Sequence, residues 1–163
     1  DLKPENILLH ASGHVMLTDF NLSKQAQTPT QAKLIQGMFA QANKAKVQMK
    51  PALVTNSFVG TEEYIAPEVI IGQGHDSSVD WWSFGILLFE MLFGLTPFKG
   101  RTRDETFTQI LKRGVAFPEA PAVSREARSL IKKLLCVDPK RRLGAAHGAA
   151  DVKAHPFFAH VKW

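Results

Sequence analysis

The pattern of apolar residues in the second half of the chain predicts several helices. From Ser78 onward, apolar side chains recur at steps of three and four residues and cover several faces, which indicates a central, buried helix that Gly94 would end. A later segment is apolar on one face, with Ser124 placed to cap its amino end and Asp138-Pro139 placed to end it. The helices beyond the first are expected over residues 102–113, 124–137 and 150–154.

Two short apolar runs near the start of the chain predict a β-hairpin. Residues 7–10 and 15–18 are strand-like, and the turn between them contains Gly13, which allows a positive φ. Such a hairpin would hold Asn6 and Asp19 at neighbouring ends of its two strands. We therefore expect a mainly α fold with one small β-hairpin.

The composition is that of an ordinary globular domain, with 163 residues, 45% apolar residues and 21% charged residues. Residues 25–54 are rich in Gln, Ala, Lys and Thr without apolar periodicity, and we interpret them as an inserted, mobile loop. The single cysteine, Cys136, excludes an internal disulfide and fits a reducing compartment. No run of about 18 apolar residues is present, so a transmembrane helix is not expected.

The net charge of +5 raises the question of nucleic-acid binding. The basic residues are scattered along the chain, and the only dense group is Lys140-Arg141-Arg142. Because no sequence signature of a nucleic-acid-binding fold accompanies this group, we do not expect a nucleic-acid partner.

The first 19 residues carry the side chains needed for phosphoryl transfer. Asp1 can accept the proton of an attacking hydroxyl, and Lys3 can lie against the transferred phosphate. Asn6 and Asp19 both offer oxygen ligands to a hard divalent cation such as Mg²⁺. An isolated Asp-Leu pair would indicate nothing, but the four residues at this spacing predict a catalytic loop.

The order of the motifs resembles the C-terminal lobe of a eukaryotic protein kinase, which would cover the whole of 1–163 except roughly residues 25–54. The catalytic loop begins at Asp1 without its usual His-Arg, and Asp19-Phe20-Asn21 departs from the family's Asp-Phe-Gly at its last position. Within the family, the chain is most similar to AGC-class Ser/Thr kinases of the phototropin and fungal flippase-regulating branch. Further matching motifs are Gly60-Thr61-Glu62-Glu63-Tyr64, Ala66-Pro67-Glu68, Val79-Asp80-Trp81-Trp82, Asp138-Pro139-Lys140-Arg141-Arg142 and His155-Pro156-Phe157-Phe158.

The resemblance implies ATP and Mg²⁺ as cofactors and Ser or Thr as the phosphate acceptor, since Lys3 is typical of Ser/Thr kinases. Thr61 is expected to hydrogen-bond Asp1 and Lys3, and Leu8 to form the floor of the adenine pocket. Ser57 occupies the position of the activation-loop phosphosite, which implies an upstream activating kinase.

Other residues are implied to recognise the substrate or to support the site. Glu5 and Glu90 would bind a basic residue upstream of the phosphate acceptor, and a solvated role for each carboxylate stays open. Substrate contacts are also implied for Phe58 and Ile65. The implied structural support consists of a buried Glu68–Arg142 ion pair and of Asp80, which would accept hydrogen bonds from the catalytic-loop backbone.

Asn21 restricts the backbone where the family has glycine, although Asn is the non-glycine residue that best tolerates a positive φ. We expect Asn21 to favour one arrangement of the neighbouring Asp19. The resemblance also implies a cytoplasmic protein, with any membrane association supplied by regions outside the chain.

A catalytically inactive pseudokinase or scaffold is the alternative. The chain contains neither a glycine-rich loop nor the lysine that pairs with a helix glutamate, and by itself it is expected to be inactive. The retention of Asp1, Lys3, Asn6 and Asp19 favours a working kinase, because a degenerate site would be expected to lose one of them.

Overall fold

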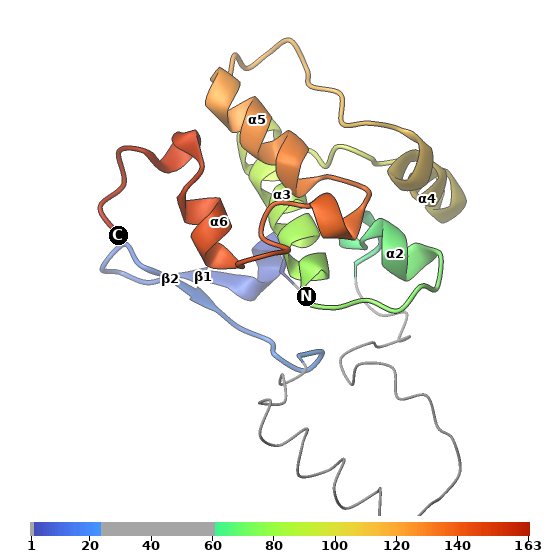
Figure 1. Ribbon diagram of the computed structural model, residues 1–163, viewed down its shortest axis with the longest axis horizontal. Helices are drawn as coiled ribbons and strands as arrows, with labels where there is room; N and C mark the ends of the chain where they lie inside the picture. Colours follow the sequence, from blue (N-terminus) through green and yellow to red (C-terminus); the bar gives the residue numbers. More distant parts are fainter. Residues whose placement is uncertain (1, 24–60) are drawn as a thin grey trace, which may run out of the picture.

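A computed structural model describes residues 2–23 and 61–163, so Asp1, Ser57, Phe58 and the predicted insertion at 25–54 lie outside the described residues. The helices gather around α3, and a two-stranded antiparallel sheet lies at one side of them (Figure 1). The predicted mainly α fold with a small β-hairpin is confirmed. The elements are η1 (Pro4–Asn6), β1 (Ile7–Leu9), β2 (Val15–Leu17), η2 (Glu62–Tyr64), α2 (Pro67–Ile70), α3 (Ser78–Phe93), α4 (Arg103–Lys112), α5 (Arg125–Leu134), η3 (Pro139–Arg141), α6 (Ala149–Lys153) and η4 (Pro156–Phe158).

Helix α3 is the central element, as its apolar pattern predicts. Trp82 and Ile86 are fully buried, and Phe89 on the next turn is 1% exposed. The helix ends at Phe93 because Gly94 takes a left-handed conformation with φ 73°. The N–H of Gly94 donates to the carbonyl of Glu90 at 2.8 Å, which closes the last turn.

Helix α5 packs against α3 at a point where only glycine fits. A Cβ on Gly85 would lie 2.8 Å from the Leu135 side chain and 2.9 Å from Cβ of Leu134. The amino end of α5 is capped as predicted, because the N–H of Ala127 donates to Oγ of Ser124 at 3.0 Å. The buried face of α5 consists of Ala127, Leu130, Ile131 and Leu134.

The carboxyl end of α5 was predicted at Val137, and this is wrong. The helix ends at Leu134, and Leu135 leaves helical geometry with φ −88° and ψ 34°. The apolar pattern continues to Val137, but Val137 is exposed, so burial of its side chain does not support a further helical turn. The carbonyl of Cys136 accepts a hydrogen bond from Nε of Arg142 at 3.1 Å in the segment that follows the helix.

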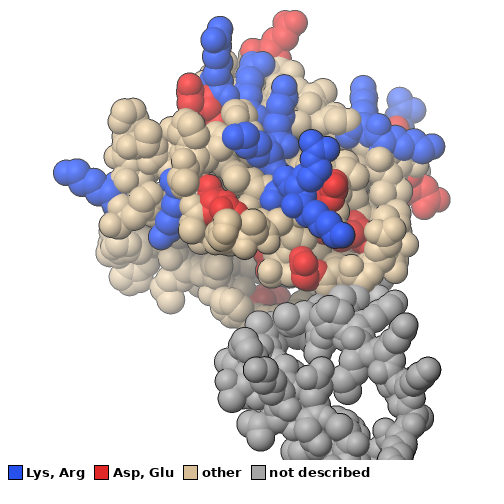
Figure 2. All heavy atoms as spheres, viewed as in Figure 1, with Lys and Arg blue, Asp and Glu red and all other residues tan. Residues whose placement is uncertain are grey.

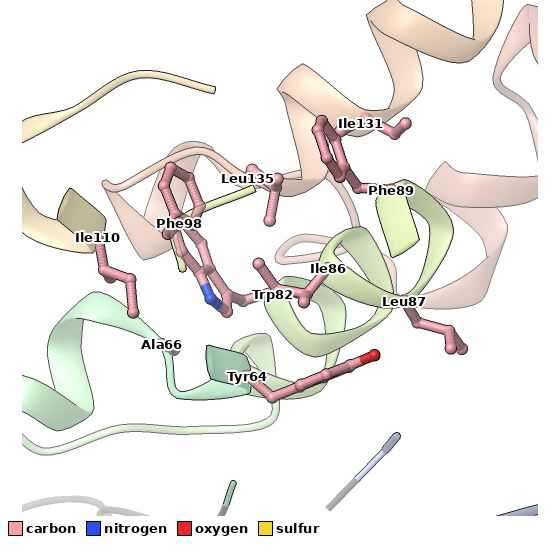
Figure 3. Close-up of a cluster of buried hydrophobic side chains, with 10 residues drawn as sticks. All are labelled: Tyr64, Ala66, Trp82, Ile86, Leu87, Phe89, Phe98, Ile110, Ile131 and Leu135. Carbon is pink, nitrogen blue, oxygen red and sulfur yellow. The ribbon is translucent and has the colours of Figure 1, made fainter. Parts of the chain in front are cut away.

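The main hydrophobic core joins α3 to the segment around η2. Trp82 and Phe98 stack with ring centroids 5.7 Å apart and an interplanar angle of 11°. Figure 3 shows Tyr64 and Ala66 beside Trp82, so the segment that carries Thr61 is anchored in the core. The buried members of this cluster are Tyr64, Ala66, Trp82, Ile86, Leu87, Phe89, Phe98, Ile110, Ile131 and Leu135.

The hairpin pairs Ile7 with Leu17 and Leu9 with Val15, and Gly13 in its turn has φ 85°. The strands are shorter than the predicted runs by one residue each. Unlike the helices, the hairpin exposes most of its apolar side chains, and Leu9 is 76% exposed. The hairpin therefore contributes little to the core and serves mainly to fix the residues at its open end.

Lys and Arg side chains are spread over the face that carries α5, with Asp and Glu among them (Figure 2). This distribution agrees with the scattered basic residues of the sequence. Within residues 2–23 and 61–163, none of the helices combines the length and the apolar character that crossing a membrane requires.

Candidate active site

The open end of the hairpin brings the two proposed metal ligands together. The N–H of Thr18 donates to the carbonyl of Asn6 at 2.9 Å, and the hydroxyl of Thr18 donates to the same carbonyl at 3.3 Å. Asn6 is buried with 7% exposure, whereas Asp19, the residue after Thr18, is exposed. The hairpin thus places an amide and a carboxylate from distant positions of the sequence at one end of the sheet.

Asp19 adopts a left-handed backbone conformation with φ 57°. It is the only non-glycine residue with a positive φ in the described part of the chain, so this conformation occurs at Asp19 and not at Asn21. Asp is among the residues that tolerate it best, but the conformation still costs free energy. The backbone N–H of Asn21 donates to Oδ1 of Asp19 at 3.4 Å, a bond that the glycine of the family motif could make equally well.

These residues fit a magnesium site by the chemistry of their donors. Mg²⁺ takes oxygen ligands and usually keeps several waters and substrate phosphates, so one carboxylate and one amide oxygen suffice from the protein. The described residues contain no cluster of three or more His, Cys, Asp or Glu side chains that could hold a metal ion. Asn6 and Asp19 are therefore the donors to consider.

Lys3 reaches from the start of the chain to the segment before α2. Its Nζ donates to Oγ1 of Thr61 at 3.1 Å, across 58 positions of sequence. The expected contact of Thr61 with Lys3 is thus present, and the contact with Asp1 lies outside the described residues. Thr61 directly precedes η2, whose Tyr64 is buried in the core, so the position of the Lys3 ammonium depends on the core.

The expected ion pair between Glu68 and Arg142 is present and buried. Arg142 donates through Nη1 to Oε1 of Glu68 at 2.7 Å and through Nη2 to Oε2 at 2.8 Å, a bidentate arrangement. It also donates to the carbonyl of Ser78 at 2.9 Å and lies over the Trp82 ring at 5.3 Å. The pair ties α2 to the amino end of α3 and to η3.

The hydroxyl of Tyr64 lies against the carboxylate of Glu90. This hydroxyl donates a short hydrogen bond to Oε2 of the half-buried Glu90. Burial of the phenol, the hydrogen bond to Glu90 and the nearby charges of Glu5 and Glu63 together raise the pKa of Tyr64 far above its usual range. Glu5 and Glu90 therefore both raise the pKa of the same phenol. The resemblance implies these two carboxylates for substrate recognition.

The remaining sequence candidates lie in different environments. Leu8 is 52% exposed on β1. Ile65 is 5% exposed, which leaves little of its surface for the implied substrate contact. Asp80 lies in the first turn of α3, where partial burial of the carboxyl raises its pKa, although the residue as a whole retains exposed surface. Its hydrogen bond to the catalytic-loop backbone stays a prediction.

Two ion pairs next to Thr61 were missed in the sequence. Lys99 lies 3.3 Å from Glu63, and Arg103 lies 3.4 Å from Glu62. The first joins η2 to the segment between α3 and α4, and the second joins η2 to the first residue of α4. The sequence feature that could have indicated these ion pairs is the pair of adjacent acids in the Gly-Thr-Glu-Glu-Tyr motif. Their basic partners are more than 35 positions away, so the sequence alone does not connect them.

Comparison with known proteins agrees with this geometry. Residues 1–158 match the family described as "Protein kinase domain". Over its whole length, the chain is 57% identical to Flippase kinase 1 of Saccharomyces cerevisiae and 53% identical to Serine/threonine-protein kinase nrc-2 of Neurospora crassa. It is 49% identical to Phototropin-1A of Oryza sativa.

The chain spans only 18%, 27% and 18% of the lengths of these three relatives, respectively. The similarity to the phototropins and to the fungal flippase kinase confirms the branch that the motifs indicated. The protein kinase family as a whole uses ATP and Mg²⁺ and acts on protein substrates. The kinase motifs, the hairpin that unites Asn6 with Asp19 and these similarities lead to one conclusion: the chain belongs to the protein kinase domain family.

Proposed function

We propose that this chain supplies the catalytic loop and substrate-binding lobe of a serine/threonine protein kinase. Three observations support the proposal: η1 supplies Asn6, the end of the hairpin supplies Asp19, and the Lys3 ammonium donates a hydrogen bond of 3.1 Å to Thr61. A pseudokinase would have no need to retain Lys3, Asn6 and Asp19 together.

The residues divide the work of phosphoryl transfer among them. Asp1 orients the acceptor hydroxyl and takes its proton, and Lys3 stabilises the negative charge of the transferred group. Asn6 and Asp19 would hold Mg²⁺, and Leu8 would contact the adenine. When bound, ATP with Mg²⁺ supplies the phosphoryl group and neutralises its charge.

Substrate choice follows from the acidic side chains near Tyr64. Glu5 and Glu90 favour a protein substrate with a basic residue upstream of its Ser or Thr. Both carboxylates place negative charge near the Tyr64 phenol, and this charge attracts a cation. Ser57 is the proposed site at which an upstream kinase activates the enzyme, through the added negative charge of a phosphate.

The test uses this sequence within a complete kinase domain. Transfer of labelled phosphate from ATP to a peptide with upstream arginines and a central Ser should be measurable. The same peptide with Tyr in place of Ser should not be labelled. An Asp1→Asn variant serves as the control for a contaminating kinase. A folded domain that binds nucleotide but labels none of these peptides would refute the proposal and support the scaffold alternative.

A further inference from the structure

We propose that Lys99 sets the substrate specificity of this kinase by acting as a built-in competitor for the basic residue of the substrate. The inference rests on the proposed function, since it concerns the same acidic surface around Glu5 and Glu90. It assigns a specificity role to a lysine that lies outside every kinase motif of the sequence.

Lys99 pairs with Glu63 from an exposed position on the surface. Its Nζ lies 3.3 Å from Oε1 of Glu63, while the hydroxyl of Thr96 donates a short hydrogen bond to Oε2 of the same carboxylate. Thr96 is 5% exposed, so one oxygen of Glu63 is fixed from the interior. The Lys99 side chain is 66% exposed, compared with 26% for Glu63. A buried hydroxyl thus positions the carboxylate, and an exposed ammonium neutralises it.

The negative charge of Glu63 acts together with those of Glu5 and Glu90, the two carboxylates proposed to bind the substrate. It is adjacent to Tyr64 in η2, and the Tyr64 hydroxyl bonds to Glu90. The negative charges of Glu90, Glu5 and Glu63 all act on the Tyr64 phenol. A cation bound near any one of these carboxylates therefore lowers the attraction of the group for a second cation.

A tethered ammonium competes well with a substrate in solution, because its effective concentration is high. Its exposed position also makes it displaceable, since exposed ion pairs contribute at most about 1 kcal/mol. The expected result is a kinase that accepts peptides with few basic residues and gains little from an additional arginine. Removal of Lys99 should restore that gain.

The experiment compares two Ser peptides with the full-length protein that contains this sequence, one with an additional upstream arginine and one with glutamine at the same position. In Lys99→Ala, the KM for the arginine peptide should fall about threefold to fivefold, the factor that a weak ion pair of up to about 1 kcal/mol supports. The KM for the glutamine peptide should stay within about twofold, and kcat should be unchanged for both. Lys99→Arg should behave like the unsubstituted protein.

Arg101→Ala is the matched control, because it removes an exposed positive charge two positions away on the same loop. It should leave the preference between the two peptides unchanged. Equal changes of KM for both peptides in Lys99→Ala, or the same change in Arg101→Ala, would overturn the inference while the proposed function stands. If the unsubstituted protein phosphorylates neither Ser peptide, the proposed function fails, and the inference fails with it.

Discussion

The Glu68–Arg142 ion pair gives the sharpest test of how this lobe is held together. Arg142→Ala would remove both hydrogen bonds to Glu68, at 2.7 and 2.8 Å, and the bonds to the carbonyls of Ser78 and Cys136. Glu68 is only 3% exposed, so its carboxylate would remain buried without a partner. Breaking a buried pair on one side costs about 3–5 kcal/mol, mainly through this uncompensated charge.

The measurement is urea unfolding of a complete kinase domain that carries this sequence, followed by tryptophan fluorescence. Trp82 is a suitable reporter, because its ring is buried and Arg142 lies over it. The free energy of unfolding should fall by about 3–5 kcal/mol in Arg142→Ala. Arg141→Ala, which truncates the exposed neighbour, should change it by less than about 0.5 kcal/mol.

Two further variants separate charge from geometry. Arg142→Lys keeps the positive charge but loses the planar fork that binds both oxygens, so it should be intermediate. Combining Arg142→Ala with Glu68→Gln should cost less than the sum of the single effects, because the second change removes the unpaired charge. A loss below about 1 kcal/mol in Arg142→Ala, or strict additivity of the two changes, would refute the reasoning.

Three further predictions concern the catalytic residues and a buried histidine. Asp1→Asn should lower kcat by at least about 100-fold with little change in nucleotide affinity. Asp19→Ala should instead abolish the magnesium-dependent part of nucleotide binding, measured by calorimetry. Failure of both variants in the same step would contradict the separate roles of the two carboxylates. Asn21→Gly should increase the affinity for inhibitors that require a displaced Asp19, because glycine relaxes the turn whose N–H binds that carboxylate; unchanged affinity and unchanged basal activity would count against the idea. Burial, assisted by the charge of Lys133, lowers the pKa of His155, so the free energy of unfolding should decrease as the pH falls below about 6.5, where the unfolded chain takes up the proton first. A His155→Gln variant should lose this part of the pH dependence.

The prediction for His155 has a structural basis in its two ring nitrogens. The N–H of Phe157 donates to Nδ1 at 3.2 Å, so Nδ1 must be unprotonated. Nε2 lies 3.2 Å from Oγ of Ser129 and carries the proton in the neutral ring. A second proton would have to displace the Phe157 N–H, which explains why the folded state resists protonation. If stability were constant between pH 7 and pH 5 in both proteins, this explanation would be wrong.

The helices could be predicted from sequence wherever burial alone decides their extent. Helix α3 runs over Ser78–Phe93 as expected, since its apolar residues face the core on several sides and Gly94 ends it. Helix α5 stops at Leu134 although the apolar pattern continues to Val137, because Val137 is exposed and its side chain gains no burial from a longer helix. Whether an apolar side chain is buried depends on tertiary geometry, which the periodicity of one segment does not contain.

The same distinction applies to the site. Motif spacing was enough to select Asn6 and Asp19 and to place them together, because a tight hairpin leaves only one register for its ends. The left-handed conformation of Asp19 could not be predicted, since Asn21 was the more obvious candidate for it. The Lys99–Glu63 pair was also hidden, because surface ion pairs between distant loops leave no periodic signal.

The site depends on the core through a short chain of contacts. The carbonyl of Tyr64 accepts a hydrogen bond from Oγ of Ser83, and its ring lies in the cluster around Trp82, so η2 is attached to α3 by both backbone and side chain. Thr61 begins this segment and binds Lys3 at 3.1 Å. The Lys3–Thr61 hydrogen bond therefore ties the Lys3 ammonium to α3 through η2. Loosening η2 should impair phosphoryl transfer before it impairs Mg²⁺ binding by the proposed ligands Asn6 and Asp19, since their positions depend on the hairpin.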